Sequence, residues 1–484
     1  MRFLFFSILF LFSFQYSYSQ IPAVEVRAAW LTTNWGLDWP RRGTSVESQK
    51  AELCAILDDL KEQNFNTILF QTRAQGSVFY KSKIEPLSEY FNHSDNFDPL
   101  AFTIEECHKR GMECHAWIIT YPMQKAKVKY TGRGRHKKAI PLDRKPDYYK
   151  LVGSTWYLDP GRPETRTLIL SIVKEIVSNY DVDGIHFDYI RYPSNTGKFP
   201  DDDTFKKYGN GNNLQDWRRG NINKLVSEVY DEVKSMKKWV QVSSSPLGRY
   251  KVLPDVAPND GWTAYETVFQ DAGYWMQSGK HDLVFPMMYY KERYFYPFLD
   301  DWIKNSNGRI VVPGLGVYQM DEQNWDLQDI LNQVKYTRDK KVQGQAYFRV
   351  GNVLKNLKGI KDSIYSYYPT PAKLPPLTWL NNEPPQTPTN ILIYKSEGDT
   401  LNIVWDSPNR NEELTYTIYA TFTEDVDADN GGHILATGIR GTSYSFPMGI
   451  GDYGVYYTLT ASNRYHNESK PSFTEFFVHS KESH

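Results

Sequence analysis

Eight short apolar runs separate stretches of helical hydrophobic spacing between Glu25 and Tyr368. The runs cover residues 25–33, 66–73, 113–120, 182–190, 239–245, 281–289, 309–315 and 342–348. Between them apolar residues recur every three to four positions, as Ile222, Leu225 and Val229 do, which is the spacing of an amphipathic helix. Eight strand–helix units with apolar strands predict an α/β fold, a closed (β/α)8 TIM barrel over residues 20–368. An open doubly wound sheet is disfavoured because no glycine-rich phosphate turn follows the first run.

The composition changes after Tyr368, and the chain of 484 residues is too long for one ordinary core. Residues 369–390 are rich in Pro, Thr and Asn, which predicts a semi-rigid linker. Residues 391–484 contain short alternating strands with an early Trp405, the pattern of a small β-sandwich. With Tyr457-Thr-Leu-Thr-Ala-Ser-Asn463 in the penultimate strand, this part resembles a fibronectin type III domain.

The first 19 residues have the pattern of a secretory signal peptide. Arg2 precedes an apolar run over residues 3–14, and Ser17-Tyr-Ser19 gives a small-x-small cleavage pattern. The run is too short to span a membrane, and no Cys follows it for lipid attachment. We therefore expect an exported protein, periplasmic or secreted, with no membrane anchor.

Charge and cysteine content exclude several function classes. A net charge of −1 gives no general case for a nucleic-acid partner. Cys54, Cys107 and Cys114 are the only cysteines, and an odd number cannot form a complete disulfide framework. We expect buried free thiols, with a Cys107–Cys114 bridge as the alternative. No CxxC or HExxH motif occurs, so neither a metal nor another cofactor is predicted.

Asp188 is the first candidate catalytic residue. In the run 182–190, Gly184, His186 and Asp188 share one face, since side chains alternate along a strand. A carboxylate at the carboxyl end of an apolar strand lies where α/β barrels carry their active sites. The alternative is a structural ion pair with Arg191 or Arg73.

A second carboxylate is harder to place. Cleavage of a glycosidic bond usually requires two carboxyl groups flanking the bond. Glu292 follows the run 281–289 and is the second catalytic candidate, with an ordinary surface Glu as the alternative. Asp38, in the loop after the first run, is a further candidate for the cleft; the alternative is a turn-forming Asp before Trp39-Pro40.

Other side chains near the strand ends form the predicted substrate-binding set. Besides Asp38 they are Gln71, Arg73, His115, Trp117, Tyr121, His186, Arg191, Tyr289 and Arg349. A mixture of aromatic rings and guanidinium groups suits a polyhydroxylated or acidic sugar. His115, His186 and Trp117 are alternatively core residues. An inward Arg73 requires an anionic partner, either Asp188 or a carboxylate of the substrate.

With these residues placed, the barrel resembles the bacterial glycosyl-hydrolase-like family 10 over roughly residues 23–368. The resemblance rests on Val26-Arg-Ala-Ala-Trp-Leu-Thr-Thr33, Leu37-Asp-Trp-Pro40, Gln71-Thr-Arg73, His115-Ala-Trp117, Trp156-Tyr-Leu-Asp-Pro160, Asp183-Gly-Ile-His-Phe-Asp-Tyr-Ile-Arg-Tyr-Pro193 and Asp216-Trp-Arg-Arg219. It implies a barrel hydrolase of glycan strands, with peptidoglycan, particularly strands stripped of stem peptides, as the substrate class.

A more distant similarity to family 18 chitinases covers Asp183-Gly-Ile-His-Phe-Asp-Tyr189 and Met287-Met-Tyr289. It implies that Asp188 and Tyr289 polarise an N-acetyl group, although Ile190 stands where that family has its acidic Glu. Three other interpretations stay open: a non-catalytic glycan-binding barrel, a hydrolase of host or dietary polysaccharide, and an adhesion protein.

Overall fold

The computed structural model describes residues 21–92, 97–126, 128–131, 136–139, 147–193, 199–258, 261–396, 398–409, 412–448 and 454–477. The predicted signal peptide, residues 1–19, lies outside the described residues. In the described part of the chain, no helix combines the length and the hydropathy that crossing a bilayer requires. The three cysteines are free thiols, and Cys107 and Cys114 are buried.

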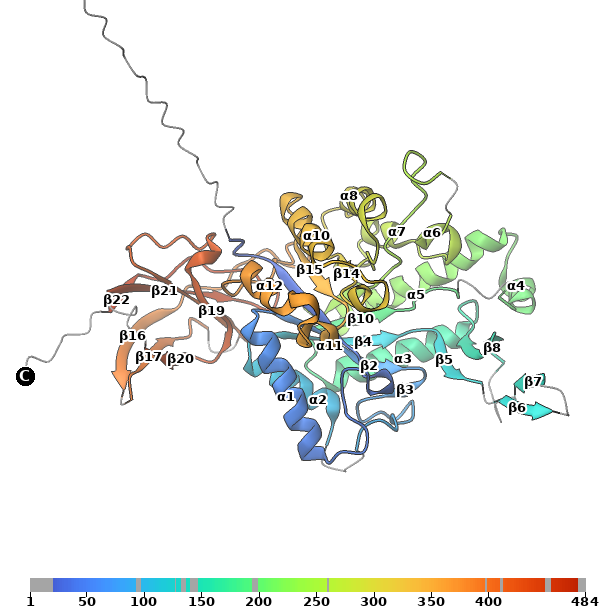
Figure 1. Cartoon of the computed structure of the whole chain (residues 1–484), viewed down its shortest axis with the longest axis horizontal. Coiled ribbons are helices and arrows are strands. Elements are labelled where there is room, and N and C mark those ends of the chain that lie inside the picture. Colours follow the sequence, from blue (N-terminus) through green and yellow to red (C-terminus); the bar gives the residue numbers. More distant parts are fainter. Residues whose placement is uncertain are drawn as a thin grey trace, which may run out of the picture.

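A closed barrel of parallel strands forms the centre of the molecule (Figure 1). Its strands are β1 (Val26–Leu31), β2 (Thr67–Ala74), β4 (Glu113–Ile119), β10 (Gly184–Asp188), β11 (Gln241–Ser244), β12 (Leu283–Val284), β13 (Ile310–Val311), β14 (Gly314–Leu315) and β15 (Gly344–Tyr347). The seventh predicted run supplies both β13, which pairs with β12, and β14, which pairs with β15. Since β15 also pairs with β1, the ring is closed, and the predicted TIM barrel is confirmed.

Helices cover the outside of the barrel. The longer ones are α1 (Val46–Glu62), α2 (Pro99–Lys109), α3 (Pro163–Asn179), α5 (Leu214–Met236), α8 (Tyr296–Lys304), α10 (Leu327–Asp339) and α12 (Ile360–Tyr367). Shorter ones are α4 (Asp202–Tyr208), α6 (Ala264–Thr267), α7 (Ala272–Gln277), α9 (Gln319–Glu322) and α11 (Val350–Leu354). Side chains cap several of them: Ser45 accepts the Ser48 N–H at α1, and Asn213 accepts that of Asp216 at α5.

Alternation along the strands divides the core into two clusters. Outward-facing Ile68, Ile185 and Val242 join the cluster beneath the helices. Inward-facing Trp30, Leu69, Trp117, Phe285, Val312 and Ala346 fill the barrel. The interior is therefore packed, and chemistry is confined to its mouth.

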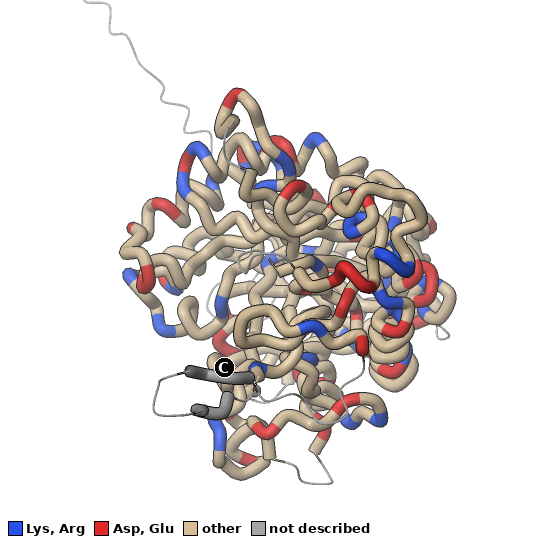
Figure 2. Tube along the Cα trace, turned by 90° about the vertical axis from the view of Figure 1, so that its right-hand side faces the viewer, with Lys and Arg blue, Asp and Glu red and all other residues tan. Residues whose placement is uncertain are grey.

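A long connection after β4 rises from the mouth of the barrel. It contains an antiparallel sheet in the order β5 (Pro122–Lys125), β9 (Thr155–Leu158) and β8 (Tyr149–Val152), and a hairpin of β6 (Val128–Thr131) and β7 (His136–Ala139). Figure 1 shows these strands at the end of the molecule opposite the C-terminal domain. Figure 2 views that end directly, and both basic and acidic residues occur along its described part.

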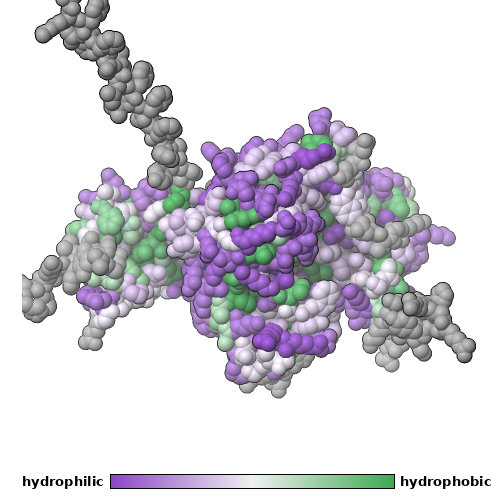
Figure 3. Space-filling model, in the orientation of Figure 1, coloured by the Kyte–Doolittle hydropathy of each residue, from purple (hydrophilic) through white to green (hydrophobic). Residues whose placement is uncertain are grey.

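The C-terminal domain is the predicted β-sandwich. One sheet has the order β16 (Thr389–Ser396), β17 (Thr400–Asp406) and β20 (Ser443–Pro447). The other has the order β19 (Ile434–Arg440), β18 (Thr415–Thr421), β21 (Val455–Ser462) and β22 (Glu475–Phe477). Leu401, Ile403, Trp405 and Leu459 are buried between them. In Figure 3 apolar patches are scattered over a largely hydrophilic surface of both domains.

The predicted linker, residues 369–390, is not a spacer between two independent bodies. Leu377 is fully buried and belongs to the same cluster as the barrel interior. The Trp379 indole N–H donates to Asp282 at a distance of 2.8 Å, and Lys373 N–H donates to the Ala23 carbonyl. The segment lies across the amino ends of the strands because its apolar side chains cover the floor of the barrel.

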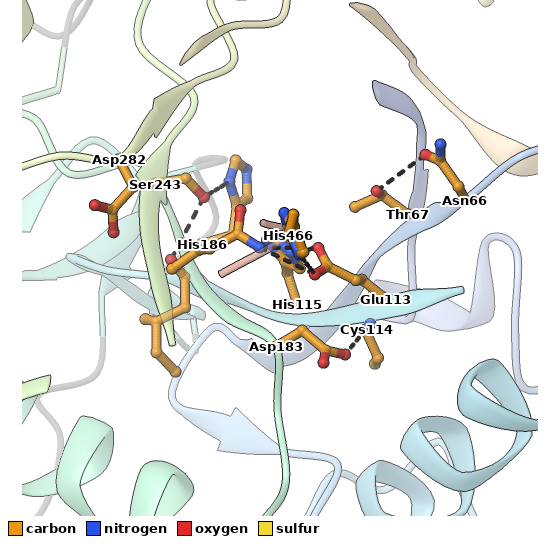
Figure 4. A network of polar contacts seen from close by, with 12 residues as sticks. Asn66, Thr67, Glu113, Cys114, His115, Asp183, His186, Ser243, Asp282 and His466 are labelled. Carbon is orange, nitrogen blue, oxygen red and sulfur yellow. Dashed lines mark hydrogen bonds and ion pairs between the residues drawn. The ribbon is translucent and has the colours of Figure 1, made fainter. Parts of the chain in front are cut away.

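The sandwich also contacts this floor through a polar network (Figure 4). Glu113, at the start of β4, lies 2.6 Å from His466 Nε2 of the sandwich and 3.0 Å from His115 Nε2. The Gln241 amide donates to the same carboxylate. Beside this network remains a cavity of about 410 Å³ lined by residues such as Asp183. The amino end of the barrel is thus closed by the C-terminal domain.

Candidate active site

Asp188 lies at the carboxyl end of β10, where the strand periodicity predicted it. Asp188 is 6% exposed, and its Oδ1 accepts a hydrogen bond from the Tyr189 N–H at 2.7 Å. Burial raises the pKa of this carboxyl, while the Arg191 cation, the Tyr189 N–H and the side chains of Ser245 and Trp117 act to lower it. Asp188 is therefore a desolvated carboxyl group surrounded by donors at the mouth of the barrel.

Tyr289 reaches the same region from the loop after β12. Burial raises the pKa of its phenol, and the negative charge of Asp188 raises it further. The ring packs at 5.6 Å from Phe348 and 5.5 Å from Tyr318, measured between centroids. Its hydroxyl makes no hydrogen bond to any described residue. A neutral phenol with a free O–H therefore lies at the mouth of the barrel, within electrostatic range of Asp188.

Arg191 supplies the cation of the site. Its guanidinium carbon lies 4.5 Å from the ring centroid of Tyr189, and it has no ion-pair partner among the described residues. Its Nε is buried without a hydrogen-bond partner within the same residues. A guanidinium group that is held in place but unpaired is suited to bind an anion.

Arg73 does not face the cleft, which corrects its predicted role. The pairing of β2 with β4 shifts register between Gln71 and Arg73, so the alternation that placed Arg73 inward fails there. The guanidinium group forms a bidentate pair with Glu85 at 2.5 and 2.6 Å and donates to the Ile119 carbonyl. The anionic partner of Arg73 is therefore Glu85, and not Asp188 or a carboxylate of the substrate.

Asp38 and Arg349, both predicted to bind substrate, bind each other. The buried Asp38 carboxylate forms an ion pair with Arg349 and accepts the N–H groups of Thr32 and Gly351 at 2.9 Å. Burial raises the pKa of Asp38, which Arg349 and the two N–H groups partly counteract. With its oxygens occupied, Asp38 fixes the loops after β1 and β15 and is not free to donate a proton.

Gln71 also supports the loop after β1, through its side-chain oxygen, while its side-chain NH2 group stays unpaired among the described residues. Its Oε1 accepts the N–H groups of Thr33 and Asn34 at 3.0 and 2.7 Å. Its Nε2 donates to no described residue and stays available for a substrate oxygen. Gln71 therefore both shapes the loop after β1 and lines the site.

The two histidines are core residues, which corrects their predicted contact with substrate. His186 is fully buried, accepts the Trp30 indole N–H at 3.2 Å and pairs through Nδ1 with Ser243 at 2.9 Å. Burial lowers the pKa of His186 far below its ordinary value, so the ring is neutral. His115 lies one step closer to the floor and contacts Glu113 (Figure 4).

Tyr121 also differs from the prediction, whereas Glu292 remains a candidate. Tyr121 is 1% exposed and packs in the outer core cluster, so it cannot form a sugar subsite. Burial raises the pKa of its phenol. Glu292 is exposed, and its carboxylate makes no hydrogen bond or ion pair to described residues; its backbone carbonyl accepts the Phe295 N–H. Of the two predicted proton donors, Glu292 keeps a free carboxylate.

Trp35 and Tyr189 belong to the mouth of the barrel but were not among the predicted site residues. Trp35 is 50% exposed in the loop after β1, and Tyr189 is 40% exposed directly after Asp188. Both have positive φ values, 57° and 49°. The sequence carried one signal for them, since each aromatic residue follows the carboxyl end of a barrel strand.

A closed α/β barrel whose mouth combines a buried carboxyl, a free phenol and aromatic rings suits a glycoside hydrolase of the TIM-barrel class. The comparisons agree. The family model described as glycosyl hydrolase-like 10 matches residues 25–307, and the chain belongs to this family.

One relative extends the match beyond the barrel. Glycosyl hydrolase YngK of Bacillus subtilis is 30% identical over 477 residues, covering 93% of this chain and 92% of the relative. Glycosyl hydrolase DigH of Escherichia coli is 30% identical over 336 residues, covering 63% of this chain and 76% of the relative. Among solved structures, the PgaB (BpsB) glycoside hydrolase domain from Bordetella bronchiseptica aligns with 70% of this chain and 98% of its own length, at 14% identity and a TM-score of 0.49.

Proposed function

We propose that this glycoside hydrolase is exported and cleaves N-acetylated glycan strands, with peptidoglycan stripped of stem peptides as the substrate class. The observation that carries the proposal is the juxtaposition of Asp188 and Tyr289 at the mouth of the barrel. The family membership supports a glycan substrate. The predicted signal sequence supports export to the periplasm or beyond.

Asp188 and Tyr289 fit the two ends of an acetamido group. The phenol O–H donates to the acetyl oxygen, and the Asp188 carboxylate accepts the amide N–H. When the acetyl oxygen attacks the anomeric carbon, positive charge develops on the acetamido group. A carboxylate with a raised pKa binds that developing charge more tightly than it binds the neutral group. The substrate then supplies its own nucleophile.

The leaving oxygen requires a proton from elsewhere. No carboxylate among the described residues hydrogen-bonds to Asp188, Tyr289 or Arg191. Since Asp38 is occupied by three partners, Glu292 is the candidate for the proton donor. The proposal is supported by its position after β12, because the loops that follow barrel strands build the active face of such barrels.

Arg191 suits the acidic sugar of peptidoglycan. Muramic acid carries a lactyl carboxylate beside its N-acetyl group, and an unpaired guanidinium group binds a carboxylate with two parallel hydrogen bonds. Arg73 and Arg349 are already paired with Glu85 and Asp38. Arg191 is thus the cation that distinguishes an acidic strand from a neutral one.

The test is release of reducing ends from purified peptidoglycan, with and without stem peptides, by wild type, Asp188→Asn and Tyr289→Phe. Release from the stripped material that is lost in Asp188→Asn supports the proposal, provided that thermal unfolding shows the variant to be folded. Full activity of Asp188→Asn removes its catalytic role. Co-sedimentation without release indicates a glycan-binding barrel, and release from neutral polysaccharide alone indicates a different hydrolase.

A further inference from the structure

We infer that Trp35 and Tyr189 are sugar-stacking platforms on the rim of the cleft, and that the enzyme therefore holds a long glycan strand and cleaves it at internal bonds. This inference rests on the proposed function and specifies how that site binds its polymer. It follows from the exposure, the backbone conformation and the shared location of the two rings.

Trp35 is held rigidly in a conformation that is unfavourable for its residue type. A left-handed backbone conformation costs a non-glycine residue free energy, and such residues persist where the surroundings determine them. Here Gln71 accepts the N–H groups of Thr33 and Asn34, and Asp38 accepts that of Thr32. The loop thus presents a half-exposed indole ring, at a cost in both backbone strain and exposed apolar surface.

Tyr189 is presented in the same way by the loop that follows β10. It has a left-handed backbone conformation and directly follows Asp188, to which its N–H donates. Arg191 stacks against the ring and fixes its orientation. Whatever lies on the Tyr189 ring is therefore adjacent to the catalytic carboxyl group.

The sheet of β5 and β9 connects the two platforms. Lys125 Nζ in β5 lies 5.4 Å from the ring centroid of Trp35. Lys125 pairs with Thr155 in β9, and Pro122 pairs with Tyr157, whose phenol senses the Arg191 charge. Since Arg191 stacks on Tyr189, the pairing of β5 with β9 and the electrostatic interaction of Tyr157 with Arg191 place both rings beside the same wall of the mouth. A strand lying along this wall would contact both.

Exposure alone does not single out these rings, but exposure together with backbone conformation does. Tyr274 and Tyr365 are 50% and 58% exposed, yet both lie in outer helices with ordinary backbone angles. Among the exposed aromatic residues of the described chain, only Trp35 and Tyr189 have positive φ. Planar rings that face solvent beside a glycosidase cleft suit the apolar C–H faces of pyranose rings.

The experiment compares Trp35→Ala with Trp35→Phe and with the control Tyr365→Ala on N-acetylated glycan strands of graded length. We expect Trp35→Ala to lower kcat/KM for long strands by about tenfold, the order of effect of truncating one aromatic contact to alanine. The loss should grow with strand length and be smallest on the shortest cleaved strand, and Trp35→Phe should retain most of the activity. Product sizes at early times should show internal cleavage.

An equal effect of Trp35→Ala on all lengths, or none on any, would overturn the inference while leaving the proposed function intact. If the wild type cleaves no glycan, the proposed function fails, and the platforms are then tested by co-sedimentation with long strands. Loss of binding in Trp35→Ala but not in Tyr365→Ala supports the platforms in that case. Equal binding of all three proteins rejects them.

Discussion

His466 Nε2, in the C-terminal sandwich, lies 2.6 Å from Glu113 Oε1 at the first residue of β4. Burial disfavours the charged form of both groups, but the attraction and the hydrogen bond between them favour it more strongly. The pKa of Glu113 therefore lies well below its ordinary value, and the pKa of His466 lies above its ordinary value. The contact is therefore an ion pair between the two domains. It ties the sandwich to the floor of the barrel.

Replacing His466 by Gln should lower the free energy of unfolding by about 3 kcal/mol, because it leaves Glu113 buried without its cation. The raised pKa of His466 means that this stabilisation is complete below the ordinary histidine pKa and is lost as the pH rises through the raised value. The difference between wild type and variant should therefore be largest near about pH 5–6 and shrink at alkaline pH. Urea unfolding at several pH values measures it.

His433→Gln provides the control, since His433 contacts only its own loop in the sandwich through Asp427 and Asn430. It should change stability little at any pH. A His466→Gln protein as stable as wild type at pH 6 would mean that the two domains are held by apolar contacts alone.

Replacing Arg73 by Met should destabilise the barrel by about 3–5 kcal/mol, since Glu85 would lose both of its charge-assisted hydrogen bonds inside the core. The double variant Arg73→Met/Glu85→Leu should recover part of this loss. Denaturant unfolding of the three proteins measures the coupling. If Arg73→Met stays as stable as wild type but binds glycan weakly, Arg73 faces the substrate after all.

Gly184→Ala should cost about 1–3 kcal/mol, because a Cβ there would lie 2.5 Å from Nδ1 of the buried His115. Gly220→Ala in α5 is the matched control, since its Cβ would meet nothing within 4 Å and alanine favours a helix. Urea midpoints should move in opposite directions for the two variants. A neutral Gly184→Ala would show that the His115 ring can move within the barrel.

Activity should fall on the acid side as the pH drops through the raised pKa of Asp188, because the proposed mechanism uses the carboxylate form. Arg191 lowers that pKa, so Arg191→Met should move the acid limb of kcat/KM to higher pH. The profile on a neutral N-acetylated oligosaccharide reports this without interference from substrate charge. If the acid limb of the kcat/KM profile stays at the same pH in Arg191→Met, that limb reports the titration of a group other than Asp188.

Arg191→Met should also weaken binding of strands that carry lactyl carboxylates by about tenfold while sparing neutral N-acetylated strands, as expected for one charged hydrogen-bonding partner. Arg349→Met is the comparison, because it disturbs Asp38 and the loop beneath and should affect both strands equally. Both substitutions are made in a protein that also carries Asp188→Asn, so that the strands are not cleaved during the binding assay. Equal losses on both strands for Arg191→Met would reject the recognition of an acidic sugar.

The barrel could be predicted because its signal is repeated. All eight apolar runs became strands, and alternation along 182–190 correctly placed Asp188 at the mouth. The contacts of the segment 369–390 could not be predicted, because its Pro-rich composition does not reveal that Leu377 and Trp379 cover the barrel floor. Composition describes local stiffness, but it does not reveal which surface a segment packs against.

The site was less predictable, because alternation fixes a side chain's face but not its partner. Arg73 lost its inward direction at a register shift, which no pattern in Gln71-Thr-Arg73 reveals. Asp38 and Arg349 are 311 positions apart, so their pairing required the closed ring that brings β1 beside β15. Trp35 was overlooked because its exposure depends on a loop held from the neighbouring strand by Gln71.

The sandwich and the strands β5 and β8 lie at opposite ends of the molecule, as Figure 1 shows, and the mouth of the barrel lies on the side of β5 and β8. A surface, bead or fusion partner attached through the C-terminal domain would therefore leave the mouth of the barrel pointing outward. Immobilised in that orientation, the enzyme would meet an insoluble polymer with its cleft foremost. The same enzyme coupled through the loops around β5 and β8 would have its entrance obstructed.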